Sequence, residues 1–93
     1  MEKPKILKVK GRDKLIMPKN GTDFDLWELQ EIVGGYVEFI HLPNQRIMIV
    51  DEDGKAKRKP VNEKATKLLQ EAFTNRHQTI VGDVLVCGHE FIN

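Results

Sequence analysis

Cys87, His89 and Glu90 stand close together near the carboxyl terminus, and their side chains can bind metals or act in catalysis. His77 lies ten residues before Cys87 and could complete such a group. Structural zinc sites, however, use four ligands, usually in paired spacings such as C-x2-C, and this chain has a single cysteine. We therefore expect no metal site. Cys87 ends the apolar run "DVLVC", which favours a small core residue over an exposed, reactive thiol.

The other residue types used in catalysis form no recognisable group. The chain contains no serine, which excludes a serine nucleophile. The segment "DEDG" at residues 51–54 begins like a calcium-binding loop, but that loop needs glycine at its sixth position and the glycine here is fourth. No pair of carboxylates is placed for acid–base work. We therefore predict a protein that is not an enzyme and carries no cofactor.

Two glycines, Gly34 and Gly35, interrupt the stretch "LQEIVGGYVEF" at residues 29–39. They could cradle a phosphate, or they could let the chain leave a helix. A helix binds anions at its amino-terminal end, where free N–H groups point outward, and these glycines follow a helical pattern. We therefore predict a helix exit. The alternative is a ligand contact, since a bare backbone lets another group approach closely.

The run "KAKRKP" at residues 55–60 indicates a charged surface, because it contains four cations: Lys55, Lys57, Arg58 and Lys59. The last three could bind nucleic-acid phosphates together with lysines of the amino-terminal strand. The alternative is a solvated turn. The formal net charge is only +1, so folding would have to join the basic segments into one face. Aromatic residues that could stack on bases are few: Trp27, Tyr36 and His77.

The composition is that of a soluble globular protein. The chain has 93 residues, of which 40% are hydrophobic and 31% charged, and we expect one domain over residues 1–93. Its longest apolar runs are too short to span a membrane, and its start has no apolar signal core. A single cysteine suits a reducing compartment. We therefore expect a cytoplasmic protein, and dimerisation would help a domain of this size.

The hydrophobic patterns predict an α+β fold. We expect short strands at residues 5–10 and 15–17, and a helix over about 24–33 with Thr22 or Asp23 as its N-cap. A hairpin follows, then a second helix capped by Asn62, and last a strand around residues 80–87. The predicted architecture is an antiparallel sheet of four or five strands with two helices packed on one face.

The segments "YVEFIHL" and "RIMIVD" form the clearest hairpin, joined through Pro43 and Asn44. A two-residue turn would pair Phe39 with Met48 and place both on the core face. The opposite face would then carry Tyr36, Ile40 and Ile49, and it is too apolar for full exposure. Three parts could cover this face: the amino-terminal strands, the carboxyl-terminal "EFIN", or a second subunit.

Four short motifs occur together between Leu26 and the carboxyl terminus: "VGGY" at 33–36, "DEDGK" at 51–55, "PVNEKA" at 60–65 and "IVGDVLV" at 80–86. On these motifs the chain resembles an uncharacterised family, a domain of unknown function, of bacteriophages, mobile elements and their bacterial hosts. The resemblance implies no activity, no cofactor and no catalytic residue. It implies a small binder that occupies a host enzyme or defence complex, or that sequesters a signalling nucleotide.

We therefore expect a non-enzymatic protein that binds a host protein and forms a homodimer. The expected contact is the mixed face around Tyr36, Ile40 and Ile49, or the basic turn from Lys55 to Lys59. Two alternatives remain: nucleic-acid binding through that basic turn, and capture of a small signalling nucleotide. No membrane partner is expected.

Overall fold

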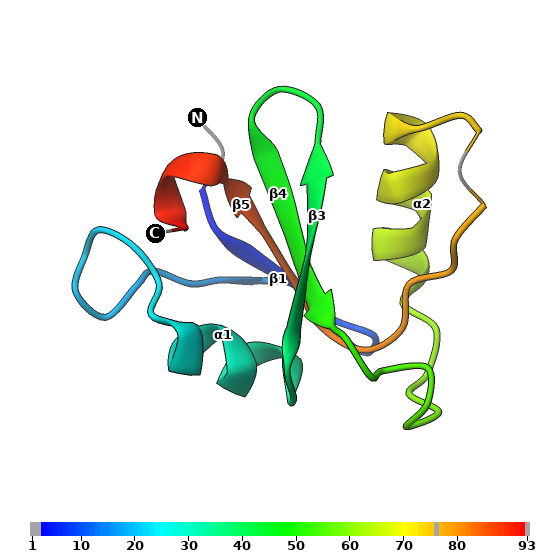
Figure 1. Ribbon diagram of the computed structural model, residues 1–93, viewed down its shortest axis with the longest axis horizontal. Coiled ribbons are helices and arrows are strands. Elements are labelled where there is room, and N and C mark those ends of the chain that lie inside the picture. Colours follow the sequence, from blue (N-terminus) through cyan, green and yellow to red (C-terminus); the bar gives the residue numbers. More distant parts are fainter. Residues whose placement is uncertain (1–2, 76, 93) are drawn as a thin grey trace.

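A five-stranded antiparallel sheet separates two helices in the computed structural model, which describes residues 3–75 and 77–92 (Figure 1). The strands are β1 (Lys5–Leu7), β2 (Lys14–Leu15), β3 (Val37–Leu42), β4 (Arg46–Asp51) and β5 (Val84–Gly88). The helices are α1 (Leu26–Val33), α2 (Glu63–Ala72) and the short 3-10 helix η1 (His89–Phe91). The strand order is β2-β1-β5-β4-β3. The predicted α+β class, with an antiparallel sheet and two helices, is confirmed.

The two helices lie on opposite faces of the sheet, and not on one face as expected (Figure 1). Met48 and Val50 of β4 join the core beside α2, which contains Leu69. Ile47 and Ile49 of the same strand join the core beside α1. The physical reason is that β4 and β5 are buried on both faces, and such strands read as continuous apolar runs rather than as alternating patterns.

Helix α1 begins at Leu26, after Asp25, and not at the earlier cap that the sequence predicted. The Asp25 N–H donates to Oε1 of Glu28 over 2.9 Å, which satisfies one free donor at the helix start. The helix ends at Val33, as expected. Gly34 follows in the left-handed region at φ 81°, and its N–H donates to the carbonyl oxygen of Gln30 over 2.8 Å. The helix exit at this glycine is confirmed.

Asn62 caps α2 as predicted and also ties three segments together. Its Oδ1 accepts from the N–H of Ala65 over 3.0 Å. Its Nδ2 donates to the carbonyl oxygens of Leu7 and Gly82, each over 2.8 Å. Because the side chain is fully buried, these bonds fix the start of α2 against the end of β1 and the approach to β5.

The register of the β3–β4 hairpin differs by one residue from the expected one. The loop contains three residues, of which Asn44 and Gln45 have positive φ angles of 64° and 60°. Phe39 therefore pairs with Ile49, and Ile40 with Met48. A shift of one residue moves every side chain of a strand to the other face. Ile40 is consequently buried beside α2, while Phe39 lies on the α1 side and is 40% exposed.

Candidate functional site

The carboxylate of Asp51, at the end of β4, is the buried centre of a charge cluster whose lysines are partly exposed. Its side chain is 1% exposed, and its Oδ2 lies 2.8 Å from Nζ of Lys57 and 2.6 Å from Nζ of Lys59. Its Oδ1 accepts the N–H of Asp53 over 2.9 Å. Burial alone would raise the pKa of this carboxyl, but the hydrogen bonds from the two lysines outweigh burial and lower the pKa to about 2.

The same two lysines bind the carbonyl oxygens at the end of α1. Nζ of Lys57 donates to the oxygen of Gly34 over 3.0 Å, and Nζ of Lys59 donates to the oxygen of Val33 over 2.6 Å. Cations are stabilising at this end of a helix because its free carbonyls carry partial negative charge. We call Asp51, Lys57, Lys59 and these two carbonyls the Asp51 cluster.

Gly35 makes the close approach of these groups possible. A Cβ at this position would collide with Nζ of Lys57 and would lie 2.8 Å from Oδ1 of Asp51. The structure confirms the helix exit and gives no evidence of a ligand contact at the glycine pair. Gly34 provides the helix exit, and Gly35 admits a close neighbour, which is the protein's own lysine.

The basic turn is thus divided into two pairs of cations. Lys57 and Lys59 are held in the Asp51 cluster, with side-chain exposures of 41% and 23%. Lys55 and Arg58 are exposed. Nucleic-acid binding through this turn stays a prediction, and two of its four cations, Lys57 and Lys59, already pair with the Asp51 carboxylate.

The predicted mixed face does not form as a surface. Tyr36 is 69% exposed, but Ile40 and Ile49 are 3% and 0% exposed and belong to cores on opposite sides of the sheet. The one-residue change in hairpin register is the cause. A binding surface made of these three residues together is therefore wrong.

The residues considered for metal binding are spread over different environments. Cys87 is buried in the core beside α1, whereas His89 and Glu90 are exposed on η1 and His77 is exposed after α2. The ring centroids of His89 and His41 lie 5.8 Å apart. Within residues 3–75 and 77–92, no group of three or more histidine, cysteine or acidic side chains could hold a metal ion. In the same part of the chain, no helix is long and apolar enough to cross a bilayer.

A small apolar hollow lies between α1 and the segment that follows β2. We call it the Trp27 hollow; it has a volume of about 250 Å³ and is lined by Ile16, Met17, Lys19, Trp27, Glu28, Glu31 and Ile32. Met17 and Trp27 are 56% and 47% exposed. Sequence reasoning noted Trp27 only as a possible stacking residue. The missed signal was a pair of large apolar residues, Met17 and Trp27, in the segments before and within the first predicted helix.

A second hollow collects lysines from the two basic segments of the chain. This lysine hollow has a volume of about 580 Å³, and Lys8, Lys10 and Lys59 line it together with Val9, Ile32, Val33, Gly34, Pro60, Gly82 and Asp83. Asp83 accepts the N–H of Val9 through Oδ1 over 2.9 Å, which holds the end of β1 against the start of β5. Folding thus brings amino-terminal lysines close to the basic turn.

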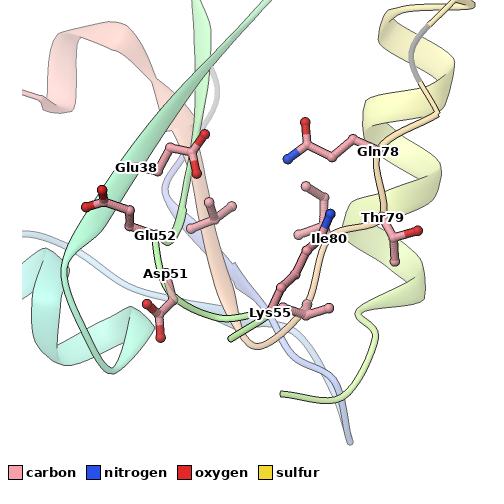
Figure 2. Close-up of a pocket in the computed structure, with 9 residues that line it drawn as sticks. Glu38, Asp51, Glu52, Lys55, Gln78, Thr79 and Ile80 are labelled. Atoms are coloured by element: carbon pink, nitrogen blue, oxygen red, sulfur yellow. The ribbon is translucent and has the colours of Figure 1, made fainter. Parts of the chain in front are cut away.

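A third hollow lies between the start of β3, the end of β4 and the segment that leads to β5 (Figure 2). Glu38 and Glu52 stand on one side of it and Gln78 on the other, while the Asp51 carboxylate points away (Figure 2). Its volume of about 80 Å³ is well below the roughly 300–1,000 Å³ typical of small-molecule sites. It is too small to hold a nucleotide.

The family model of a domain of unknown function, DUF3846, matches residues 5–92. The chain belongs to this family. The match includes β1 and β2, which lie before the motifs that carried the sequence resemblance, so the DUF3846 domain contains the whole five-stranded sheet. No curated protein and no solved structure matches the chain.

Proposed function

We propose that this DUF3846 chain is a non-enzymatic binding protein that docks onto another protein through the Trp27 hollow. The observation that carries the proposal is the exposure of Met17 and Trp27, 56% and 47%, around an apolar depression. Aromatic residues and methionine are enriched in protein interfaces, and a few buried anchors supply most of the binding energy. The volume of about 250 Å³ is below the range of small-molecule sites and suits an inserted side chain.

Hydrogen bonds around Glu28 hold the hollow in shape. Its two carboxylate oxygens accept the N–H groups of Asp25 over 2.9 Å and of Lys19 over 3.0 Å, which ties the loop to α1. These two hydrogen bonds lower the pKa of Glu28, and the bond from Asp25 has the larger effect. Nζ of Lys19 lies 4.2 Å from the ring centroid of Trp27 and orients it. A preformed site loses less conformational entropy on binding.

The chemistry of the hollow defines the partner. Its lining is mostly apolar, and among its charged residues Glu31 is exposed. We therefore expect a partner that inserts an apolar side chain and carries a basic residue next to it. The family resemblance supports a phage or mobile-element origin, with a host defence or regulatory protein as the partner. The single cysteine supports action in the cytoplasm.

Affinity capture with matched variants tests this function. The wild-type chain, a Met17→Ser/Trp27→Ala double variant and a Val61→Thr control are used as baits in lysate of the bacterial host. Val61 is 49% exposed and does not line the Trp27 hollow. We expect one protein to be retained by wild type and by the control and lost with the double variant. If no retained protein depends on Met17 and Trp27, the proposal is wrong.

The lysine hollow favours a second candidate, the sequestration of a phosphorylated small molecule such as a signalling nucleotide. Its volume of about 580 Å³ lies within the range of small-molecule sites, and Lys8 and Lys10 could bind phosphate there. A ligand that binds only the folded state raises the thermal unfolding midpoint. We expect a cyclic-nucleotide panel to contain a ligand that raises the midpoint of wild type but not of Lys8→Gln/Lys10→Gln. A panel without any shift would exclude the nucleotides tested.

A further inference from the structure

Strand β3 forms an open edge of the sheet. Within the described residues it pairs only with β4, and the pairing is continuous from Val37 to Leu42 without a bulge. The sequence "VEFIHL" of this strand contains no lysine and no proline, the residues that commonly protect an edge from pairing. The opposite edge, β2, has only two residues, one of which is Lys14. One edge is therefore short and charged, whereas the other can accept a further strand.

The backbone groups that face outward from β3 follow from the hairpin pairing. The N–H of Glu52 donates to the carbonyl oxygen of Tyr36 over 2.8 Å, so the backbone N–H and C=O groups of Tyr36 point towards β4. Along an antiparallel strand, the backbone groups of successive residues point alternately to one neighbouring strand and to the other. Glu38, Ile40 and Leu42 are therefore directed inward. Val37, Phe39 and His41 present their N–H and C=O groups at the open edge.

We propose that two copies of this chain pair through β3 in antiparallel orientation, with the two-fold axis at Phe39. Phe39 then faces Phe39 of the second copy, and Val37 faces His41 in both directions. All three outward residues of each copy obtain hydrogen-bonded partners, and the two sheets become one. Closed two-fold pairing is the commonest arrangement of protein homo-oligomers.

Neighbouring groups disfavour the two adjacent registers, because each would lose hydrogen bonds. An axis at Ile40 would place Val37 opposite Pro43, which has no N–H to donate. An axis at Glu38 would place His41 opposite Gly35, whose N–H already donates to the carbonyl oxygen of Gln30 over 3.2 Å. The axis at Phe39 avoids both conflicts.

The position of Phe39 favours a second copy over an unrelated strand as the occupant. Phe39 is the middle one of the three outward residues, and its ring is 40% exposed on the α1 side. Pairing about this residue therefore brings two exposed rings together, and aromatic cross-strand pairs stabilise sheets. No residue of the Trp27 hollow lies on β3, so the dimer can fail without affecting the proposed function.

Cysteine cross-linking tests the register directly. Residues that face each other in a hydrogen-bonded pair have Cα atoms about 5.5 Å apart, within the range of disulfides. We expect Phe39→Cys to give a disulfide-linked dimer on mild oxidation. Leu15→Cys, on the opposite edge and 67% exposed, and wild type with its buried Cys87 are the controls. A mixture of Val37→Cys and His41→Cys proteins should cross-link, whereas neither protein should cross-link alone.

Sedimentation equilibrium tests the assembly without a cross-link. We expect wild type to be dimeric and Phe39→Glu, which places two like charges at the axis, to associate at least about tenfold more weakly. Circular dichroism checks that this variant is folded. If it is unfolded, the cross-linking pattern of the cysteine variants decides the test. A monomeric wild type would overturn the proposal. So would a dimer that cross-links equally well through Leu15→Cys.

Discussion

Nζ of Lys59 lies 2.6 Å from the carbonyl oxygen of Val33, although 26 residues separate the two in the sequence. The same ammonium pairs with Asp51. The end of α1, the end of β4 and the basic turn are thus joined at one point, and two of the four cations of the turn, Lys57 and Lys59, serve the fold.

Replacing Asp51 with asparagine should destabilise the fold by about 2 to 3 kcal/mol. Breaking a buried ion pair leaves uncompensated charge, and the cost here is moderated because the two lysines are partly exposed and can reach water. Urea unfolding followed by circular dichroism measures the change. Asp53→Asn, at an exposed position two residues away, is the control. Equal stability of the two variants would contradict the role of Asp51.

The pH dependence of stability should contain a contribution from Asp51 at acid pH. The pKa of this carboxyl is about 2 in the folded protein against an ordinary 3.8. Because the folded pKa is the lower one, the contribution is complete above about pH 4 and is lost as the pH falls towards 2. The loss amounts to about 2 kcal/mol. Urea midpoints of wild type and Asp51→Asn should converge over this interval, and parallel curves would disprove the assignment.

Gly35→Ala should destabilise the protein by about 1 to 2 kcal/mol through overpacking. The added methyl group meets Nζ of Lys57 and Oδ1 of Asp51. A double-mutant cycle with Lys57→Ala isolates the contact with the lysine, since the cost of the alanine should fall once the ammonium is absent. If the two substitutions were additive, Lys57 would not be the neighbour that requires glycine here.

The four cations of the basic turn should separate into two classes. Lys57→Gln and Lys59→Gln should lower the free energy of unfolding, whereas Lys55→Gln and Arg58→Gln should change it by no more than about 0.5 kcal/mol. Equal effects of all four would contradict the division. Electrophoretic retardation of nucleic acid at low salt serves as the functional readout. Retardation that disappears in Lys55→Gln/Arg58→Gln would favour the nucleic-acid alternative over protein binding.

The features that the sequence predicted correctly are those set by neighbouring residues. A helical stripe followed by Gly34 indicates where α1 ends, and Asn62 before an apolar periodicity indicates where α2 begins. The strand register depended instead on whether Gln45 joins the loop, and nothing in its residue type indicates a left-handed conformation. The Asp51 cluster depended on groups far apart in the sequence. Its one local sign was an aspartate at the end of an apolar strand, close to several lysines.

The sequence contains one indication that the helices lie on opposite faces of the sheet. An antiparallel strand with one face in water alternates apolar and polar residues, whereas "RIMIV" and "DVLVC" are apolar at nearly every position. Such runs indicate cover on both sides. Deciding which helix covers which side still required the register, and for this reason Ile40 and Ile49 were placed together on one surface.

The location of β5 constrains how the chain acquires its structure. This strand follows all the others in the sequence yet lies between β1 and β4, so the two outer strand pairs share no ladder without it. No strand can therefore join the β1–β2 pair to the β3–β4 pair until Val84–Gly88 is available, and removal of this strand would divide the sheet rather than trim it.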